Sequence, residues 1–129
     1  MAAERCHEWG LGPSEELAEL GCHSFELEHR RAVFEVIVVH LDGDFHAYLN
    51  RCPHTGVALN WQPQQFLSVD GEYLQCATHG ALFRRNDGLC IWGSCVGQSL
   101  TAVPVLVRDG KVVLRAPLAL LEGLSAQAI

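Results

Sequence analysis

The chain has 129 residues, the size of one ordinary globular domain, of which 49% are hydrophobic and 19% are charged. This hydrophobic fraction is enough for one compact core, so extensive disorder is excluded and we expect residues 1–129 to form a single domain. The formal net charge of −6 disfavours nucleic acid and anionic lipid as partners, and it suits docking onto a basic patch of another protein.

The sequence predicts neither secretion nor membrane insertion. The N-terminus has no basic start leading into an apolar stretch, so we expect no secretory signal. The longest apolar runs, residues 36–39 and 103–107, are far too short to span a bilayer. We therefore expect a cytoplasmic protein with no membrane partner. In that compartment, six cysteines indicate metal binding or redox chemistry rather than a disulfide framework.

The first predicted element is a short helical turn over residues 14–21, with Ser14 as its N-cap and Gly21 at its end. Strand signals dominate after it. Residues 24–27 and 32–41 are rich in Val, Ile and Phe, which favour extended structure. Both segments are therefore predicted to be strands.

Four Asp-Gly turns divide the rest of the chain, and the first, at residues 41–44, predicts a hairpin that leads into a strand over 45–49. Several short strands separated in this way are typical of an all-β antiparallel sandwich or small barrel, which is the predicted fold class. The tail over residues 118–124 predicts at most one helical turn. The other turns lie at residues 69–72, 86–88 and 108–111, and further strands are expected at 73–76, 89–92, 101–107 and 112–114.

Two short segments carry the residues best suited to redox chemistry. The segment CPHTG at residues 52–56 and the segment CATHG at residues 76–80 each offer one thiol and one imidazole beside a glycine. Each follows a predicted strand, so both can lie on loops at the same end of a sheet. Thiolates suit iron bridged by sulfide, and neutral imidazole also binds iron. The glycines would let backbone N–H groups point at sulfur. The candidate metal ligands are Cys52, His54, Cys76 and His79.

The pattern C-x-H followed by C-x-x-H resembles the cluster signature of the Rieske family. In that family, two Cys hold one iron of a [2Fe–2S] cluster and two His hold the other. The resemblance covers roughly residues 17–115. It implies a small Rieske-like antiparallel sandwich or barrel with a cluster-binding subdomain of two loops. It also implies that Cys52 and Cys76 bind the inner iron, whereas His54 and His79 bind the outer, more exposed iron.

Departures from high-potential Rieske proteins indicate the subtype. Those proteins have a disulfide where this chain has Val57 and Thr78, and hydroxyl donors where it has Ala81 and Phe83. Hydrogen bonds to sulfur raise the potential, so their loss implies a potential on the order of −150 mV. The chain is thus similar to the small soluble Rieske ferredoxins. The resemblance implies a one-electron carrier from a reductase to a terminal oxygenase or related enzyme, with no catalysis of its own.

Two alternatives to this function stay open. One is a small Rieske-like subunit of a nitrite-reductase-type enzyme, and the other is a zinc-stabilised interaction module, although zinc modules usually use different ligand spacings. Outside the ligand segments, Cys90 and Cys95 are interpreted as two buried thiols rather than a disulfide. Residues 93–98 occupy the place of the family's third loop, which covers one side of the cluster and here has no Pro.

Overall fold

The computed structural model of the chain describes residues 5–51, 58–59, 66–68, 70–77, 80–93 and 95–127, without the side chains of 123–127. Within these residues the chain forms three antiparallel sheets and two helices, which confirms the predicted all-β class. The helices are α1 (Ser14–Leu20) and α2 (Leu118–Gln127). No described helix has the length and apolar character that crossing a membrane requires.

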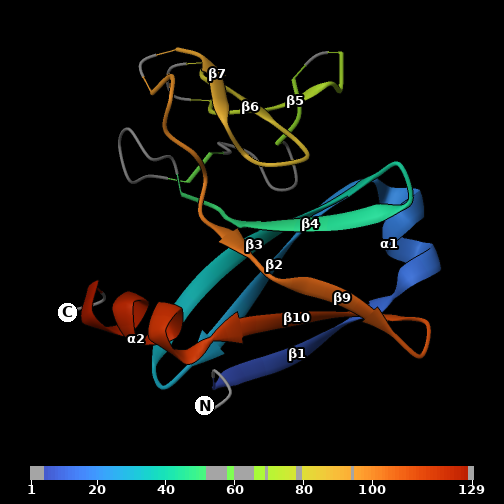
Figure 1. Ribbon diagram of the computed structural model, residues 1–129, viewed down its shortest axis with the longest axis vertical. Coiled ribbons are helices and arrows are strands. Elements are labelled where there is room, and N and C mark those ends of the chain that lie inside the picture. Colours follow the sequence, from blue (N-terminus) through green and yellow to red (C-terminus); the bar gives the residue numbers. More distant parts are fainter. Residues whose placement is uncertain are drawn as a thin grey trace.

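Two of the sheets form the larger part of the fold. One has the order β1-β10-β9 and the other has the order β2-β3-β4-β8; we call them together the basal sandwich. Both helices lie beside these sheets in Figure 1. The strands are β1 (Cys6–Pro13), β2 (Cys22–His29), β3 (Ala32–Leu41), β4 (Asp44–Leu49), β8 (Ala102–Val103), β9 (Val105–Arg108) and β10 (Lys111–Pro117).

The third sheet, which we call the small sheet, has the order β5-β6-β7 and lies at one end of the molecule, above β4 (Figure 1). Its strands are only three residues long: β5 (Tyr73–Gln75), β6 (Leu82–Arg84) and β7 (Cys90–Trp92). Strands this short cannot bury an apolar face by themselves, so the small sheet depends on neighbouring segments for its core.

Strand β3 connects two hydrophobic cores. Val36 and Val38 belong to the core of the basal sandwich, together with Leu114 from β10. The alternate residues, Ile37 and Val39, belong to the core beneath the small sheet. Because successive side chains of a strand point to opposite faces, an apolar run is what a strand buried on both faces needs. The continuous apolar run of residues 36–39 in β3 thus places the small sheet on the basal sandwich.

Several predicted elements are confirmed and others need correction. The predicted strand at 32–41 is β3, and the hairpin at 41–44 joins β3 to β4. The predicted strand at 101–107 is interrupted at Pro104: β8 pairs with β4, whereas β9 pairs with β10. Proline lacks the N–H that a sheet ladder needs, so the chain changes sheets there.

The ends of both helices also differ from the prediction. Pro13, with extended backbone, occupies the N-cap position of α1; Ser14 is already helical and donates its N–H to the Gly110 carbonyl. Gly21 ends the helix as expected. The tail forms the ten-residue helix α2 instead of one turn, because Leu121 and its apolar neighbours pack on the basal core.

The hairpin between β2 and β3 has an unusual turn. Arg30 and Arg31 both have positive φ angles, 49° and 72°, which two-residue hairpin turns require but which Asn and Gly adopt far more readily. Replacing Arg31 by Gly is expected to raise the free energy of unfolding by about 1 kcal/mol, because left-handed backbone strains any residue with a Cβ. The Arg31→Ala variant is the control for loss of the charge. Urea unfolding in which the Gly variant is no more stable than the Ala variant would contradict this assignment.

Candidate metal centre

Of the four expected ligands, the structure describes Cys76. Cys52, His54 and His79 lie outside the described residues, as do Val57 and Thr78. Cys76 follows β5 directly, and its side chain is completely buried in the core beneath the small sheet. With three candidates outside the described residues, the part of the chain that the structure describes contains no group of three or more metal-ligating side chains.

The backbone around Cys76 forms a tight turn. The Cys76 N–H donates to the Ala81 carbonyl at 2.9 Å, and the Gly80 N–H donates to the Cys76 carbonyl at 2.7 Å. Gly80 has a φ of +72°, and a Cβ at this position would contact the Trp92 ring at 3.6 Å. These bonds hold the two ends of the second candidate segment close together, and they explain why glycine follows its histidine.

A chain of hydrogen bonds joins the two candidate segments. Asn50, two residues before Cys52, accepts a hydrogen bond on Oδ1 from the Leu59 N–H at 2.8 Å. The Leu59 carbonyl in turn accepts from the Ala77 N–H at 2.7 Å, next to Cys76. Residues that flank the first segment are therefore bonded directly to the second segment. Asn50 and Leu59, which flank the first segment in sequence, therefore lie at the same end of the fold as Ala77, whereas the first segment itself lies outside the described residues.

The Asn50 side chain is held from behind by Glu35 on β3. The Asn50 amide donates to the Glu35 carboxylate, and the Asn50 N–H donates to the Glu35 carbonyl at 2.9 Å. The Ser24 hydroxyl donates to the other carboxylate oxygen at 3.2 Å. Sequence reasoning missed this network. Its signal was Glu35, the one carboxylate within the apolar run of residues 32–41.

Replacing Asn50 by Ala is expected to lower the free energy of unfolding by about 1–3 kcal/mol, because the Leu59 N–H and the Glu35 carboxylate each lose a partner. Occupancy of the metal centre should fall as well, because the bonds joining the two segments weaken. Asn86→Ala, at an exposed position in the β6–β7 turn, is the matched control. Equal urea midpoints and equal metal contents for the two variants would show that Asn50 does not organise the site.

The third loop, residues 93–98, packs against the end of the second segment. Gly93 has a φ of +110°, and a Cβ there would lie only 2.9 Å from the Ala81 Cα. The loop has no proline, but backbone hydrogen bonds restrain it. The Cys90 N–H donates to the Gln98 carbonyl, and the Gln98 N–H donates to the Cys95 carbonyl. Cys90 and Cys95 are two buried thiols, as predicted.

Tyr48 on β4 attaches the small sheet to the basal sandwich. Its hydroxyl donates to the Arg85 carbonyl at 2.8 Å, and its ring lies so close to Gly88 that a Cβ there would approach to 2.9 Å. Burial, and secondarily the charge of Asp87, raises the pKa of Tyr48 to about 12. The hydroxyl therefore stays protonated and remains a donor at neutral pH.

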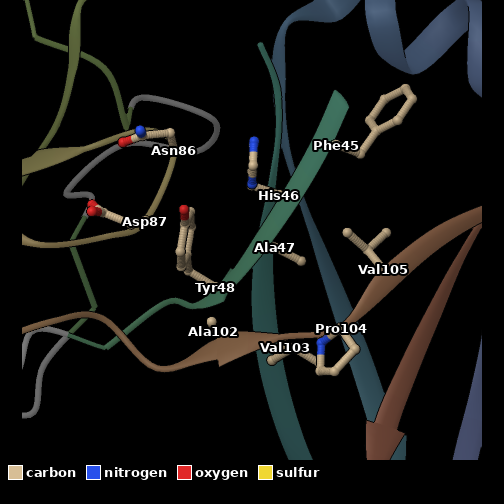
Figure 2. Close-up of a pocket in the computed structure, with 10 residues that line it drawn as sticks. All are labelled: Phe45, His46, Ala47, Tyr48, Asn86, Asp87, Ala102, Val103, Pro104 and Val105. Carbon is tan, nitrogen blue, oxygen red and sulfur yellow. The ribbon is translucent and has the colours of Figure 1, made fainter. Parts of the chain in front are cut away.

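A cavity of about 340 Å³ adjoins this junction, and Tyr48 lies between β4 and the β6–β7 turn in Figure 2. Two polar side chains that line this cavity already have partners: the Tyr48 hydroxyl donates to the Arg85 carbonyl, and the Asp87 carboxylate accepts from the Arg84 guanidinium and the Leu89 N–H. The cavity therefore belongs to the junction between the two parts of the fold. The remaining lining residues are Phe45, His46, Ala47, Asn86, Ala102, Val103, Pro104 and Val105.

The small-sheet end of the protein carries no excess charge. Residues 50–100 contain three acidic residues and three arginines, so the net charge of −6 arises entirely from the rest of the chain. Arg84 pairs with Asp87, and Arg85 lies 3.9 Å from the Glu72 carboxylate. Among the described residues of this segment, four large apolar side chains are exposed: Leu67, Ile91, Trp92 and Val96.

A family model for the Rieske [2Fe–2S] domain matches residues 8–112, most of the chain. The chain belongs to the Rieske family. The Rieske domain binds a [2Fe–2S] cluster, which argues against the zinc-stabilised module. A comparison with curated protein sequences finds no match.

Solved structures share the Rieske fold of this chain. The terminal oxygenase of carbazole 1,9a-dioxygenase from Novosphingobium sp. KA1 matches with a TM-score of 0.69 and 25% identity, over 88% of this chain and 31% of the oxygenase chain. This Rieske chain thus spans about a third of that oxygenase. A chain in the complex of reduced oxygenase and oxidised ferredoxin of carbazole 1,9a-dioxygenase matches with a TM-score of 0.62 and 20% identity. That match covers 83% of this chain and 91% of the other.

The described residues fit the family's cluster. Cys76 supplies a buried thiol, the kind of donor that iron bridged by sulfide prefers. Phe83 is fully buried in the same core as Cys76, and Ala81 also belongs to that core. Neither side chain carries a hydroxyl that could donate to sulfur. The core around Cys76 is therefore apolar at positions 81 and 83.

Proposed function

We propose that this Rieske protein is a one-electron carrier that passes electrons from a reductase to a terminal oxygenase or a related enzyme, without catalysis of its own. Cys52 and Cys76 would hold one iron, and His54 and His79 the other. When bound, the cluster takes up and releases one electron. The observation that supports the proposal is the hydrogen-bonded link from Asn50 through Leu59 to Ala77, because it brings the residues on either side of the first family ligand segment to the second segment.

The chain's own residues would position the cluster and exclude water from it. The Asn50 and Glu35 side chains fix the start of the first segment, and the Gly80 turn fixes the second. Phe83 and Leu74, both fully buried, keep the Cys76 side chain in an apolar core. Such an apolar setting limits the reorganisation of solvent around the cluster. Because neither Ala81 nor Phe83 carries a hydroxyl, neither side chain can donate a hydrogen bond that favours the reduced state.

The surface near the second segment suits docking of a protein partner. Trp92 is 59% exposed although its ring lies against Gly80, next to the proposed ligand His79. Because residues 50–100 are neutral overall, apolar contact rather than charge would hold the partner at this end. Docking through apolar contact differs from the expectation drawn from the net charge, which is docking of an acidic surface onto a basic patch of the partner. The proposal of an oxygenase as partner is supported by the similar solved structures, which include oxygenase–ferredoxin complexes.

We also propose that residues 1–129 act as one domain in the cytoplasm. Strand β3 supplies side chains to both described cores, so the small sheet and the basal sandwich support each other. None of the five described cysteines is in a disulfide, which suits a reducing compartment.

The test of the proposal is a coulometric titration of the iron-loaded protein. We expect reversible uptake of one electron per chain, with a midpoint on the order of −150 mV. Ala81→Ser and Phe83→Tyr should raise the midpoint, because each adds a hydroxyl to the core around Cys76. Ala102→Ser, at an exposed position in β8, is the control and should leave it unchanged. Irreversible reduction, or a high potential in the unaltered protein, would contradict a low-potential carrier.

A further inference from the structure

Cys90 and Cys95 form a pair of thiols that the electron-carrier function does not use. The Cys95 thiol donates to the Cys90 sulfur at 3.0 Å, and the Cys90 thiol lies 3.3 Å from the Trp92 carbonyl oxygen. Both side chains are only 1% exposed. Among the described cysteines, this is the pair whose sulfur atoms are in contact.

The backbone holds the two cysteines in position without help from the sulfurs. The Cys90 N–H donates to the Gln98 carbonyl at 2.9 Å, and the Gly97 N–H donates to the Cys90 carbonyl at 3.3 Å. The Gln98 N–H donates to the Cys95 carbonyl at 2.8 Å. A disulfide has its sulfurs about 2.05 Å apart, so closure needs an approach of about 1 Å. Small side-chain rotations suffice, and these backbone bonds can persist.

We propose that Cys90 and Cys95 are an oxidisable dithiol, which a hydroperoxide converts into an intramolecular disulfide across the third loop. One sulfur attacks the O–O bond of hydrogen peroxide, forms a sulfenic acid and releases water that carries off its thiol proton. The second thiol attacks the sulfenic sulfur, forms the S–S bond and releases a second water. The two thiols lose two electrons and two protons, and these reduce one peroxide to two waters.

Burial selects the oxidant and the product. The two sulfurs are only 1% exposed. We expect hydrogen peroxide, a small molecule, to reach them far more readily than oxidised glutathione, which is much larger. Because the second thiol is already in contact, the sulfenic acid is captured before it oxidises further. Cys22 gives a contrast within the chain, because burial raises the pKa of its thiol to about 12.

The disulfide would restrain the loop that packs on the second ligand segment. Gly93 lies between the two cysteines in sequence and packs against Ala81, and β7 pairs with β6 through Phe83 and Cys90. A cross-link between residues 90 and 95 lowers the conformational entropy of the unfolded chain and so stabilises the folded state. Oxidation would therefore lock the third loop in place, independently of which partner the protein serves.

The test treats iron-loaded protein with hydrogen peroxide, then quenches, denatures and alkylates it. Trypsin yields one peptide, residues 86–108, with Cys90 and Cys95 and no other cysteine. We expect this peptide to be two hydrogens lighter and free of alkyl groups, and to regain two alkylation sites after dithiothreitol. The oxidised protein should melt at a higher temperature, and dithiothreitol should reverse the shift.

Two outcomes would overturn the proposal. One is a fully alkylated peptide 86–108 at peroxide doses that already oxidise Cys6. The other is conversion of Cys90 and Cys95 to sulfonic acids without a disulfide. Cys95→Ser serves as the control and should show neither the lighter peptide nor the melting shift. Because the mass measurement uses the unaltered protein, the test stands even if that variant folds poorly.

Discussion

Replacing His79 by Ala, or Cys76 by Ser, is expected to abolish the bound cluster, with loss of visible absorption and of iron from the purified protein. In the proposed ligand set, each iron would take one ligand from each of two segments that lie apart in sequence, so one substitution would leave an iron with an incomplete set of protein ligands. The cluster also ties the segments together, and metal binding contributes directly to folding in such sites. The variants should therefore unfold at markedly lower urea concentration than the loaded protein.

The chain offers a matched pair of control substitutions. Cys22 and His23 are also adjacent metal-ligating residue types. They lie on β2 outside the proposed ligand segments, although Cys22 packs against the core that contains Cys76. Cys22→Ser and His23→Ala should retain full iron and sulfide content. Native iron content in the His79 variant, or loss of iron in the β2 variants, would contradict the proposed ligand set.

Replacing Gly93 by Ala is expected to destabilise the protein far more than replacing Gly97 by Ala. Both glycines have positive φ angles, +110° and +92°, so both substitutions strain the backbone. At Gly97 a Cβ would meet nothing within 4 Å, whereas at Gly93 it would lie 2.9 Å from the Ala81 Cα. Overpacking against the backbone typically lowers the free energy of unfolding by about 1–3 kcal/mol. The Gly93 variant should therefore lose that much more stability than the Gly97 variant.

The difference should also appear in the cluster. Ala81 accepts the Cys76 N–H, so displacing Ala81 disturbs the turn that carries the second ligand segment. We expect reduced iron content in Gly93→Ala and normal content in Gly97→Ala, measured beside their urea unfolding curves. Similar stability and similar iron content in the two variants would mean that the third loop does not support the second segment.

Much of the basal sandwich could be predicted because its strands carry strong local signals. The Val- and Ile-rich run of β3 and the Asp42-Gly43 turn indicate their structure without reference to the rest of the chain. Strand β1 was missed because Gly10, Gly12 and Pro13 weaken its strand signal, and its partner β10 lies about a hundred residues later. Strand β6, with three residues, depends on its neighbours rather than on its own sequence.

The ligand set could be proposed from sequence because metal ligands must be particular residue types at fixed spacing. The supporting groups could not. Glu35 and Asn50 are ordinary polar residues, and only the fold places the Asn50 side chain between β3 and Leu59. Likewise, the spacing of Cys90 and Cys95 does not decide whether their sulfurs meet; the backbone bonds to Gln98 do.

The most direct test of the ligand set is pulsed electron paramagnetic resonance of the dithionite-reduced protein, prepared with and without ¹⁵N-labelled histidine. We predict strong hyperfine coupling from two histidine nitrogens bound to the reduced iron, His54 and His79, with a change of isotope pattern on labelling. Coupling should remain in the labelled His23→Ala variant. A spectrum without directly bound histidine nitrogen would contradict Rieske ligation and would require a cluster held by thiolates alone.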